Sequence, residues 1–185
     1  VEEIQHDDLP IQSVLPSLPE HIEFSDSGAL MIETTTHVLS LMQSEFQVSK
    51  PDVFFVLGDR YESFAATLAA FYLKIPIVHL GGGDVTEGGC VDDALRNILS
   101  DMADVHCVIS KNSAQRLIQE GKTETSVIVT GSPVIDNILN TDLISKEDLL
   151  KQWHLTRARP IILFTQHPIP LEGEKTAHYL KESSV

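Results

Sequence analysis

The sequence alternates short apolar runs with segments whose apolar residues recur at helical spacing. Apolar, β-branched runs of about four to eight residues, bounded by turn residues, are typical of strands buried in a parallel sheet. Such runs occupy residues 52–57, 75–80, 105–110, 126–130 and 160–167. Predicted helices separate the first four runs, at residues 61–73, 92–102 and 112–120. This alternation predicts right-handed βαβ units and therefore an α/β fold with a parallel sheet and flanking helices.

Two further helices are predicted outside this alternation. Residues 1–24 contain three prolines and no sustained period, which predicts loop and short turns. A serine or aspartate at residues 25–27 can cap a helix that runs through about residue 47. After the fourth strand, residues 133–140 predict a short helix that opens with proline.

The length of 185 residues predicts one domain and the start of a second, at roughly 150 residues per domain. Residues 1–140 form the predicted α/β domain. Residues 141–159 are polar and charged, with a short helix around 146–153, and resemble a linker. Residues 160–185 offer one strand and a helix at 176–182, which cannot bury a core of their own. They either extend the first sheet or begin a second domain that is incomplete here.

The composition is that of an ordinary globular protein. Hydrophobic residues make up 42% of the chain, which excludes largely disordered, collagen-like and coiled-coil chains. Two cysteines, Cys90 and Cys107, are too few for a disulfide framework and indicate a reducing compartment. No apolar run has the length of a membrane span, and no signal peptide opens the chain. We therefore expect a cytoplasmic protein without a membrane partner.

The charge is strongly negative and unevenly distributed. The formal net charge of −14 opposes non-specific binding to nucleic acid, although a local group of cations could still hold a small anion. Residues 1–110 contain only four basic residues, namely Lys50, Arg60, Lys74 and Arg96. An arginine in so acidic a stretch raises the question of its partner.

Polar, ionisable and glycine residues follow the predicted strands. In open α/β sheets, ligands bind beyond the carboxyl ends of the strands. Glycines there let backbone N–H groups approach a phosphate or sugar, and helix N-termini favour anions. The residues at this edge are Gly58, Asp59 and Arg60, then His79 and the loop 81–89, then Ser110, Gly131, Ser132 and Pro133, and finally Gln166 and His167. They predict a domain that binds a small anionic ligand.

Each of these features has a purely structural alternative. Gly58 and Asp59 could form a turn and a helix cap, and Asp92 and Asp93 stand where capping residues also occur. His79 ends an apolar strand, where a hydrogen-bonded core histidine is the commoner case. The glycine-rich loop has neither GxGxxG nor GxxxxGK[ST] spacing, so it predicts no dinucleotide or Walker-type site. The other histidines lack ligand spacing, and we predict no metal and no cofactor.

From about residue 51 to residue 138, the sequence resembles a known family. The motifs that carry the resemblance are GDR at 58–60, HLGGGDVTEG at 79–88, DD at 92–93, Arg96, and GSPVID at 131–136. They resemble those of the hydrolysing UDP-N-acetylglucosamine 2-epimerases of sialic acid biosynthesis, including the bacterial enzymes for legionaminic acid precursors. A weaker match continues to ILFTQHP at 162–168.

The resemblance implies a glycosyltransferase-B-like fold with an active site between two Rossmann-like halves. It implies that residues 1–140 are the N-terminal half without its first strand, and that most of the second half is missing. The implied substrate is UDP-N-acetylglucosamine or a 2,4-diacetamido analogue. The C2 proton is removed, UDP leaves, and water adds to give the free manno-configured sugar. We expect the chain as given to be weakly active or inactive, and pairing between subunits is expected by family analogy.

The resemblance also assigns roles to individual residues. Asp59 and Asp92 match two catalytic carboxylates of the family. Many relatives have a catalytic Glu at the position of Gly81, and Asp84 or Glu87 could replace it; we take Asp84 as the third catalytic residue. The predicted substrate-binding residues are Arg60 at the diphosphate, Arg96 at the sugar and paired with Asp92, His167 from the second half, and His79, Gly82, Gly83, Glu87, Gly131, Ser132 and Pro133.

Three functions stay open from the sequence. The VTEG loop and GDR, in place of a GDT-type segment, favour a hydrolysing enzyme over a non-hydrolysing 2-epimerase, which keeps UDP in its product. Gly81 and the missing parts favour a third reading, a non-catalytic sugar-nucleotide-binding module. In each reading the expected partner is a UDP-sugar or UDP.

Overall fold

The structure is a computed structural model that describes residues 9–18, 27–86, 91–156, 160–165 and 175–183. The chain divides by its internal contacts into two compact units, Val1–Gly131 and Ser132–Val185. Each unit is described by itself. The domain boundaries drawn from the sequence, at residues 140 and 159, stay a prediction.

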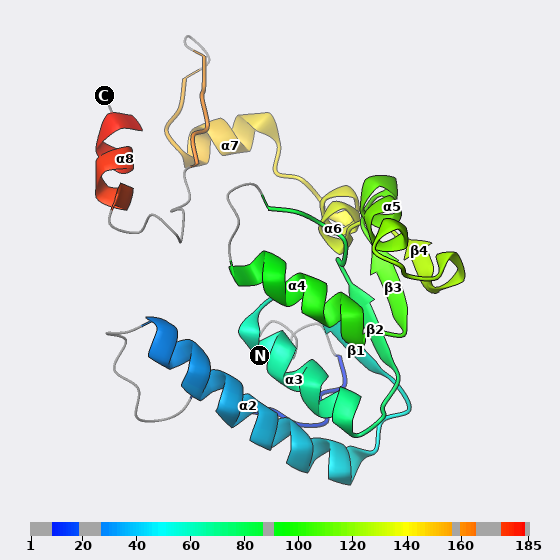
Figure 1. The fold of residues 1–185 in the computed structure, drawn as a ribbon. Helices are drawn as coiled ribbons and strands as arrows, with labels where there is room; N and C mark the ends of the chain where they lie inside the picture. The colour runs from blue at the N-terminus through cyan, green and yellow to red at the C-terminus, as the bar shows by residue number, and fades with distance from the viewer. Residues whose placement is uncertain (1–8, 19–26, 87–90, 157–159, 166–174, 184–185) are drawn as a thin grey trace. The chain divides into compact units, whose positions relative to one another are not determined.

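The first unit contains a four-stranded parallel sheet. The strands are β1 (Phe54–Leu57), β2 (Ile77–Leu80), β3 (Val105–Val108) and β4 (Val127–Val129), and they lie in the order β1-β2-β3-β4 (Figure 1). Neighbouring strands are parallel, so their carboxyl ends meet at one edge of the sheet. The predicted α/β fold and the first four predicted strands are therefore confirmed.

Helices connect the strands and cover one face of the sheet. These are α3 (Tyr61–Tyr72), α4 (Val91–Met102) and α5 (Lys111–Gln119), and a 3₁₀ turn at Glu124–Ser126 precedes β4. The long helix α2 (Ser27–Ser49) packs on α3, which lies between α2 and α4 (Figure 1). All four helices were predicted, with boundaries within a few residues of those observed.

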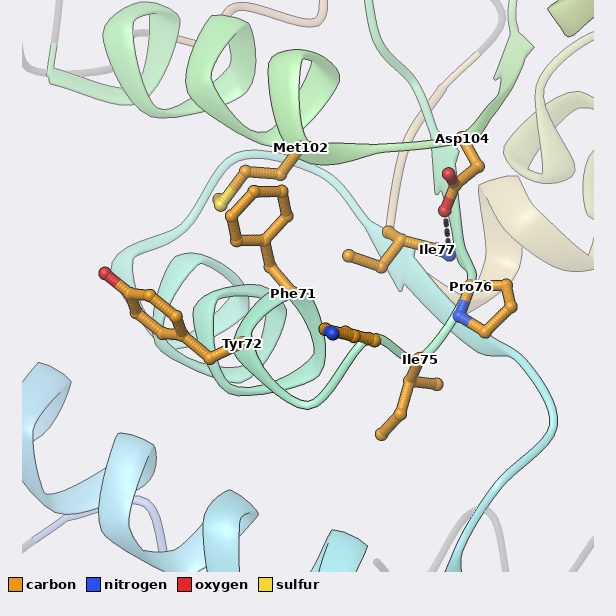
Figure 2. A pocket seen from close by; sticks show the side chains of 8 residues that line it. Phe71, Tyr72, Ile75, Pro76, Ile77, Met102 and Asp104 are labelled. Atoms are coloured by element: carbon orange, nitrogen blue, oxygen red, sulfur yellow. Dashed lines mark hydrogen bonds between the residues drawn. The ribbon is translucent and has the colours of Figure 1, made fainter.

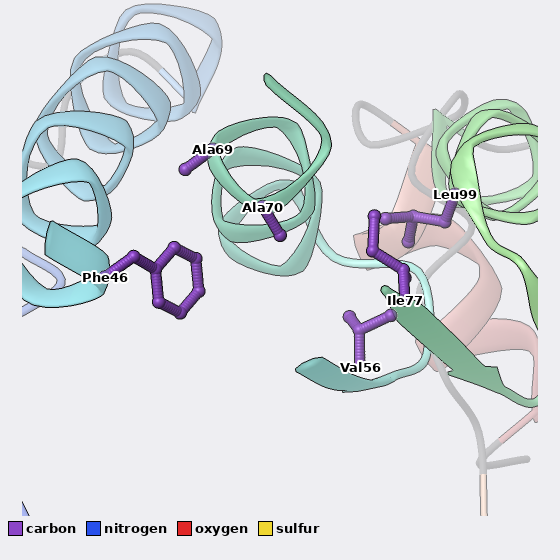
Figure 3. Close-up of a cluster of buried hydrophobic side chains, with 6 residues drawn as sticks. All are labelled: Phe46, Val56, Ala69, Ala70, Ile77 and Leu99. Atoms are coloured by element: carbon purple, nitrogen blue, oxygen red, sulfur yellow. The ribbon is translucent and has the colours of Figure 1, made fainter. Parts of the chain in front are cut away.

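The core lies between the sheet and these helices. Figure 3 shows its buried side chains, which come from α2, β1, α3, β2 and α4: Phe46, Val56, Ala69, Ala70, Ile77 and Leu99. The two alanines on α3 let the helix approach the strands closely. Burying Ile77 and Leu99 completely contributes about 2 to 3 kcal/mol each. This packing fixes the ends of β1 and β2, from which the polar residues of the site project.

Two predictions about apolar runs are wrong. The run at 52–57 was predicted to be a buried strand, but Phe55 and Leu57 are exposed on the face away from the helices. No strand forms in the described part of the fifth run, residues 160–165, where Ile162 and Leu163 are 87% and 92% exposed. A strand needs a neighbour to satisfy its backbone, and none of the described strands pairs with this run.

The described part of the second unit contains three short helices. They are α6 (Pro133–Asn140), α7 (Lys146–Gln152) and α8 (Thr176–Ser183), at the positions that the sequence predicts. Ser145 caps α7, since its Oγ accepts a hydrogen bond from the Asp148 backbone N–H at 3.1 Å. Among the described helices of both units, none is long and apolar enough to cross a membrane.

Candidate functional site

The turn after β1 places Asp59 at the carboxyl edge of the sheet. Gly58 donates its N–H to the Leu80 carbonyl at 3.1 Å and has a φ of +82°, which glycine adopts without strain. The chain then turns into α3, whose N-cap is Arg60 and not Asp59. The sequence left open whether Asp59 caps a helix, and the structure gives its carboxylate a different partner.

That partner is Arg96, from the second turn of α4. The Arg96 side chain is only 8% exposed, and its Nη2 donates to Oδ2 of Asp59. The same Nη2 lies 3.4 Å from Oγ1 of Thr86, while Nη1 donates to the Asp84 carbonyl at 3.0 Å and to Oδ1 of Asp93 at 2.5 Å. Arg96 thus joins β1, the loop after β2 and α4 at one point. The Asp59 side chain remains 26% exposed, so a ligand can reach it.

The charges in this cluster support one another. Burial by itself would lower the pKa of Arg96, but the hydrogen bonds and charges of Asp59 and Asp93 outweigh it and raise that pKa. For Asp93, burial would raise the pKa, yet hydrogen bonds from Thr86 and Arg96 lower it below its ordinary value. The guanidinium and the Asp93 carboxylate are therefore both charged at neutral pH. This answers the question of the partner of Arg96.

The structure shows a different ion pair along α4 from the predicted one. The sequence predicted Arg96 beside Asp92 at i, i+4 spacing, whereas the recorded pair is with Asp93 at i, i+3. Asp92 lies in the first turn of α4 and is half-buried. Its catalytic role stays a prediction.

His79 is a buried histidine with both ring nitrogens engaged. Its Nε2 lies 2.9 Å from the Gly58 carbonyl, which can only accept, so Nε2 carries the proton. Nδ1 therefore accepts the hydroxyl proton of Ser100 at 3.0 Å. Burial lowers the pKa of His79 and keeps the ring neutral. His79 is therefore a hydrogen-bonded core histidine, the structural alternative that the sequence left open. Its ring has no exposed surface that a substrate could contact.

Gly82 and Gly83 are buried by the packing of their loop. A Cβ at Gly82 would lie 2.7 Å from Oγ of Ser100, and one at Gly83 would lie 2.4 Å from the Ser113 carbonyl. Gly83 also has a φ of +72°. The loop can lie this close to α4 and α5 only because both side chains are absent. The packing of the loop thus accounts for both glycines, and their predicted contact with a substrate stays a prediction.

Asp84, in the loop after β2, contacts α5. Its Oδ1 accepts from Oγ of Ser113 at 3.5 Å and lies 3.9 Å from Nη1 of Arg116. Arg116 in turn donates to the Gly83 carbonyl at 2.8 Å. Sequence reasoning missed Ser113 and Arg116 because they belong to a helix that follows the next strand, and no local spacing links them to the loop.

Arg60 is the most accessible cation of the site. Its side chain is 68% exposed and makes two hydrogen bonds of 3.1 Å with the Glu62 carboxylate. The guanidinium also lies 5.6 Å from the centre of the Tyr61 ring. Exposed ion pairs of this kind contribute roughly 0 to 1 kcal/mol, so an incoming anion can displace Glu62. This exposure fits the predicted contact with a diphosphate.

The remaining predicted residues lie at the end of β4, in the second unit or outside the described residues. Gly131, with a φ of +84°, follows β4 and donates to the Val108 carbonyl at 3.3 Å. Ser132 and Pro133 begin the second unit, where they are the N-cap and first residue of α6. Glu87 and His167 lie outside the described residues.

A cavity of about 510 Å³ lies at the opposite edge of the sheet. Figure 2 shows the residues that line it at the amino ends of β2 and β3, among them Phe71, Tyr72, Met102 and Asp104. Asp104 accepts a hydrogen bond from the Ile77 backbone N–H at 2.8 Å, so its carboxylate has a structural role. Within the described residues, no group of three or more His, Cys, Asp or Glu side chains is arranged to hold a metal ion. The polar cluster around Arg96 is therefore the candidate site.

Comparison with known proteins identifies the family. Residues 11–183 match the family described as UDP-N-acetylglucosamine 2-epimerase. The chain belongs to the UDP-N-acetylglucosamine 2-epimerase family. The resemblance inferred from the sequence motifs is confirmed at this level.

Individual relatives agree with this assignment. A UDP-N,N'-diacetylbacillosamine 2-epimerase (hydrolyzing) of Legionella pneumophila is 31% identical over 93% of the chain and 44% of its own length. A GDP/UDP-N,N'-diacetylbacillosamine 2-epimerase (hydrolyzing) of Campylobacter jejuni is 31% identical over 85% of the chain and 41% of its own length. The crystal structure of the Neisseria meningitidis UDP-GlcNAc 2-epimerase bound to UDP-GlcNAc superimposes with a TM-score of 0.64 at 28% identity, over 80% of the chain and 38% of that protein. The chain thus spans less than half the length of these epimerases.

Proposed function

We propose that this member of the epimerase family is part of a hydrolysing enzyme. Its substrate is a UDP-2-acetamido sugar, either UDP-N-acetylglucosamine or a 2,4-diacetamido analogue. Two relatives named as hydrolysing epimerases of diacetylbacillosamine nucleotides support this choice. The GDR and VTEG motifs favour the same branch over the non-hydrolysing enzymes.

The observation that carries the proposal is the position of Asp59. Its carboxylate stands at the carboxyl edge of the sheet, accessible to a ligand and held by a buried arginine from another element. Ligands of parallel α/β sheets bind at this edge. A carboxylate in such a fixed position can serve as a general base or acid.

The reaction consumes one water for each UDP-sugar. A carboxylate takes the proton from C2, and the bond between C1 and the UDP oxygen breaks to leave a glycal. Water then adds its hydroxyl to C1, and a proton returns to C2 on the opposite face. The products are UDP and the free manno-configured sugar. Such chemistry needs at least one carboxylate at C2 and a cation at the leaving diphosphate.

The residues of the site divide between these roles. Asp59 and Asp92 are the proposed proton-transfer groups, and Asp84 is the proposed replacement for the carboxylate that Gly81 lacks. Arg60 is the proposed partner of the diphosphate because its guanidinium is the exposed cation beside Asp59. The other proposed substrate contacts are Arg96, Gly82, Gly83, Gly131, Ser132, Pro133, Glu87 and His167. Because relatives are more than twice as long, we also propose that residues 1–185 taken alone have weak activity or none.

Product analysis in D₂O tests the proposal. The protein, as its gene encodes it, is incubated with UDP-N-acetylglucosamine and with the UDP-2,4-diacetamido sugar. The expected products are UDP and a free sugar with manno configuration and deuterium at C2. A UDP-linked epimer would show a non-hydrolysing enzyme instead. Binding of UDP without any product or any exchange at C2 would favour the sugar-nucleotide-binding module.

A further inference from the structure

We propose that Asp93 is a positioning residue for Asp59, acting through Arg96 and the loop after β2. The proposal rests on the proposed function, since it assumes that Asp59 transfers a proton. The family motif pairs two aspartates at 92–93, and the resemblance assigns a catalytic role to the first. The structure shows that the second makes the contacts that organise the site.

The carboxylate of Asp93 ties the loop to α4. The backbone N–H of Thr86 donates to both carboxylate oxygens of Asp93, at 3.0 and 3.1 Å. Oδ1 also accepts a hydrogen bond from Nη1 of Arg96 at 2.5 Å. Thr86 precedes Asp93 by seven residues and lies outside the helix, so this contact does more than cap α4. Asp93 therefore fixes the end of the loop and the guanidinium together.

Arg96 has to satisfy two carboxylates at once. Its Nη1 is held by Asp93 and by the Asp84 carbonyl, which leaves Nη2 directed at Asp59. Without Asp93, Nη1 would lose its carboxylate partner, and the guanidinium could rotate about its contact with Asp59. A guanidinium that can rotate no longer holds the Asp59 carboxylate in one position. Asp93 thus sets where Asp59 stands, through Arg96.

The expected consequence lies in the chemical step more than in binding. A misplacement of about 1 Å at a reacting group can cost on the order of 100-fold in rate. The Asp93 side chain is half-buried and pairs with Arg96, which in turn pairs with Asp59. Asp93 therefore acts on Asp59 through Arg96. Its loss should therefore lower kcat while leaving the affinity for the UDP part of the substrate nearly unchanged.

The test compares Asp93→Asn with Asp101→Asn. Asp101 lies on the same helix, is exposed, and pairs with Lys122 at 2.6 Å, away from the cluster, so it is a matched control. Asp93→Asn is expected to lower kcat about 10- to 100-fold with KM within about threefold, and Asp93→Glu should recover part of the loss. Asp101→Asn should match the unsubstituted protein. A normal kcat in Asp93→Asn, or a loss confined to KM, would overturn the proposal.

Hydrogen exchange separates this proposal from the proposed function. If the unsubstituted protein turns over no UDP-sugar, the proposed function fails, and exchange at the Thr86 amide then decides the role of Asp93. Faster exchange in Asp93→Asn but not in Asp101→Asn supports the anchoring of the loop. Unchanged exchange overturns it. Should Asp93→Asn fail to fold, Asp93→Glu is measured in the same way, with the same two outcomes.

Discussion

Arg96 and Asp59 are 37 residues apart in sequence and form an ion pair that joins α4 to the end of β1. The arginine is buried and the carboxylate is partly exposed, so the pair has a fixed side and an accessible side. Buried ion pairs are costly to break from one side, because the remaining charge loses its partner. The pair therefore holds Asp59 in place while leaving it open to a ligand.

Asp59→Asn should abolish most of the turnover. The substitution keeps the size and one hydrogen-bonding oxygen but removes the group that exchanges a proton with C2. Loss of a general acid or base typically lowers the rate by about 10² to 10⁴. Steady-state assays give kcat, and calorimetry with UDP should show an affinity within about threefold of the unsubstituted protein.

Asp52→Asn is the matched control for this experiment. Asp52 is an exposed aspartate just before β1, at the opposite edge of the sheet from Asp59. Its substitution should leave kcat unchanged. Turnover in Asp59→Asn at the level of Asp52→Asn would exclude Asp59 as a proton-transfer group.

Much of the fold could be predicted because apolar periodicity records which side of an element faces the core. The alternation of strands and helices located β1 to β4 and their connecting helices, since residues such as Val56 and Ile77 must be buried. The run at 160–167 shows the limit of this signal. Apolar residues indicate a segment that can be buried, whereas a strand also needs a partner, and the sequence does not say whether one is present.

The candidate site was predicted in part of its members but not in its contacts. Asp59 and Arg96 were each singled out, yet their pairing depends on how α4 packs against β2, which no local spacing encodes. The sequence could propose only a helical neighbour for Arg96, and it chose Asp92 where the recorded pair is with Asp93. His79 shows a related limit, because its polarity was visible but its burial against Ser100 was not.

Arg60→Gln should weaken the binding of UDP more than that of the free sugar. The expected loss for UDP is about tenfold, since a charge-assisted contact with a diphosphate contributes about 1.5 to 3 kcal/mol and Glu62 competes for the guanidinium. Lys74→Gln removes the same charge at the opposite edge of the sheet and should change neither affinity. Calorimetric titrations with UDP and with N-acetylmannosamine distinguish these cases. Equal losses for both ligands in Arg60→Gln would exclude a role at the diphosphate.

Gly83→Ala should destabilise the fold more than Gly81→Ala does. Both glycines have positive φ, so alanine is strained at either position. Only at Gly83 does the new Cβ meet a backbone atom, the Ser113 carbonyl at 2.4 Å, while nothing lies within 4 Å of a Cβ at Gly81. We expect the free energy of unfolding to fall by about 1 to 3 kcal/mol more for Gly83→Ala, measured by urea denaturation. Equal losses would show that the loop moves away from α5 at little cost.

His106 should make the protein lose stability as the pH falls from about 6.5 to about 4. Its ring is buried in β3, and among the described residues nothing hydrogen-bonds its Nδ1. Burial, followed by the charge of Lys122, lowers the pKa of His106 to about 4. In the unfolded chain the pKa is about 6.5, so the unfolded state binds more protons throughout this window and gains stability relative to the folded state.

The loss attributable to His106 is on the order of 3 kcal/mol by the time the pH reaches the folded-state pKa. Replacing the ring by an apolar side chain removes this linkage, so His106→Leu should flatten the dependence of the unfolding free energy on pH. Part of the slope should remain, because the pKa of buried His79 is also lowered. His178→Leu, at an exposed position on α8, should leave the slope unchanged. Urea denaturation between pH 4 and pH 7 measures all three proteins, and an unaltered slope in His106→Leu would show that His106 is already solvated before unfolding.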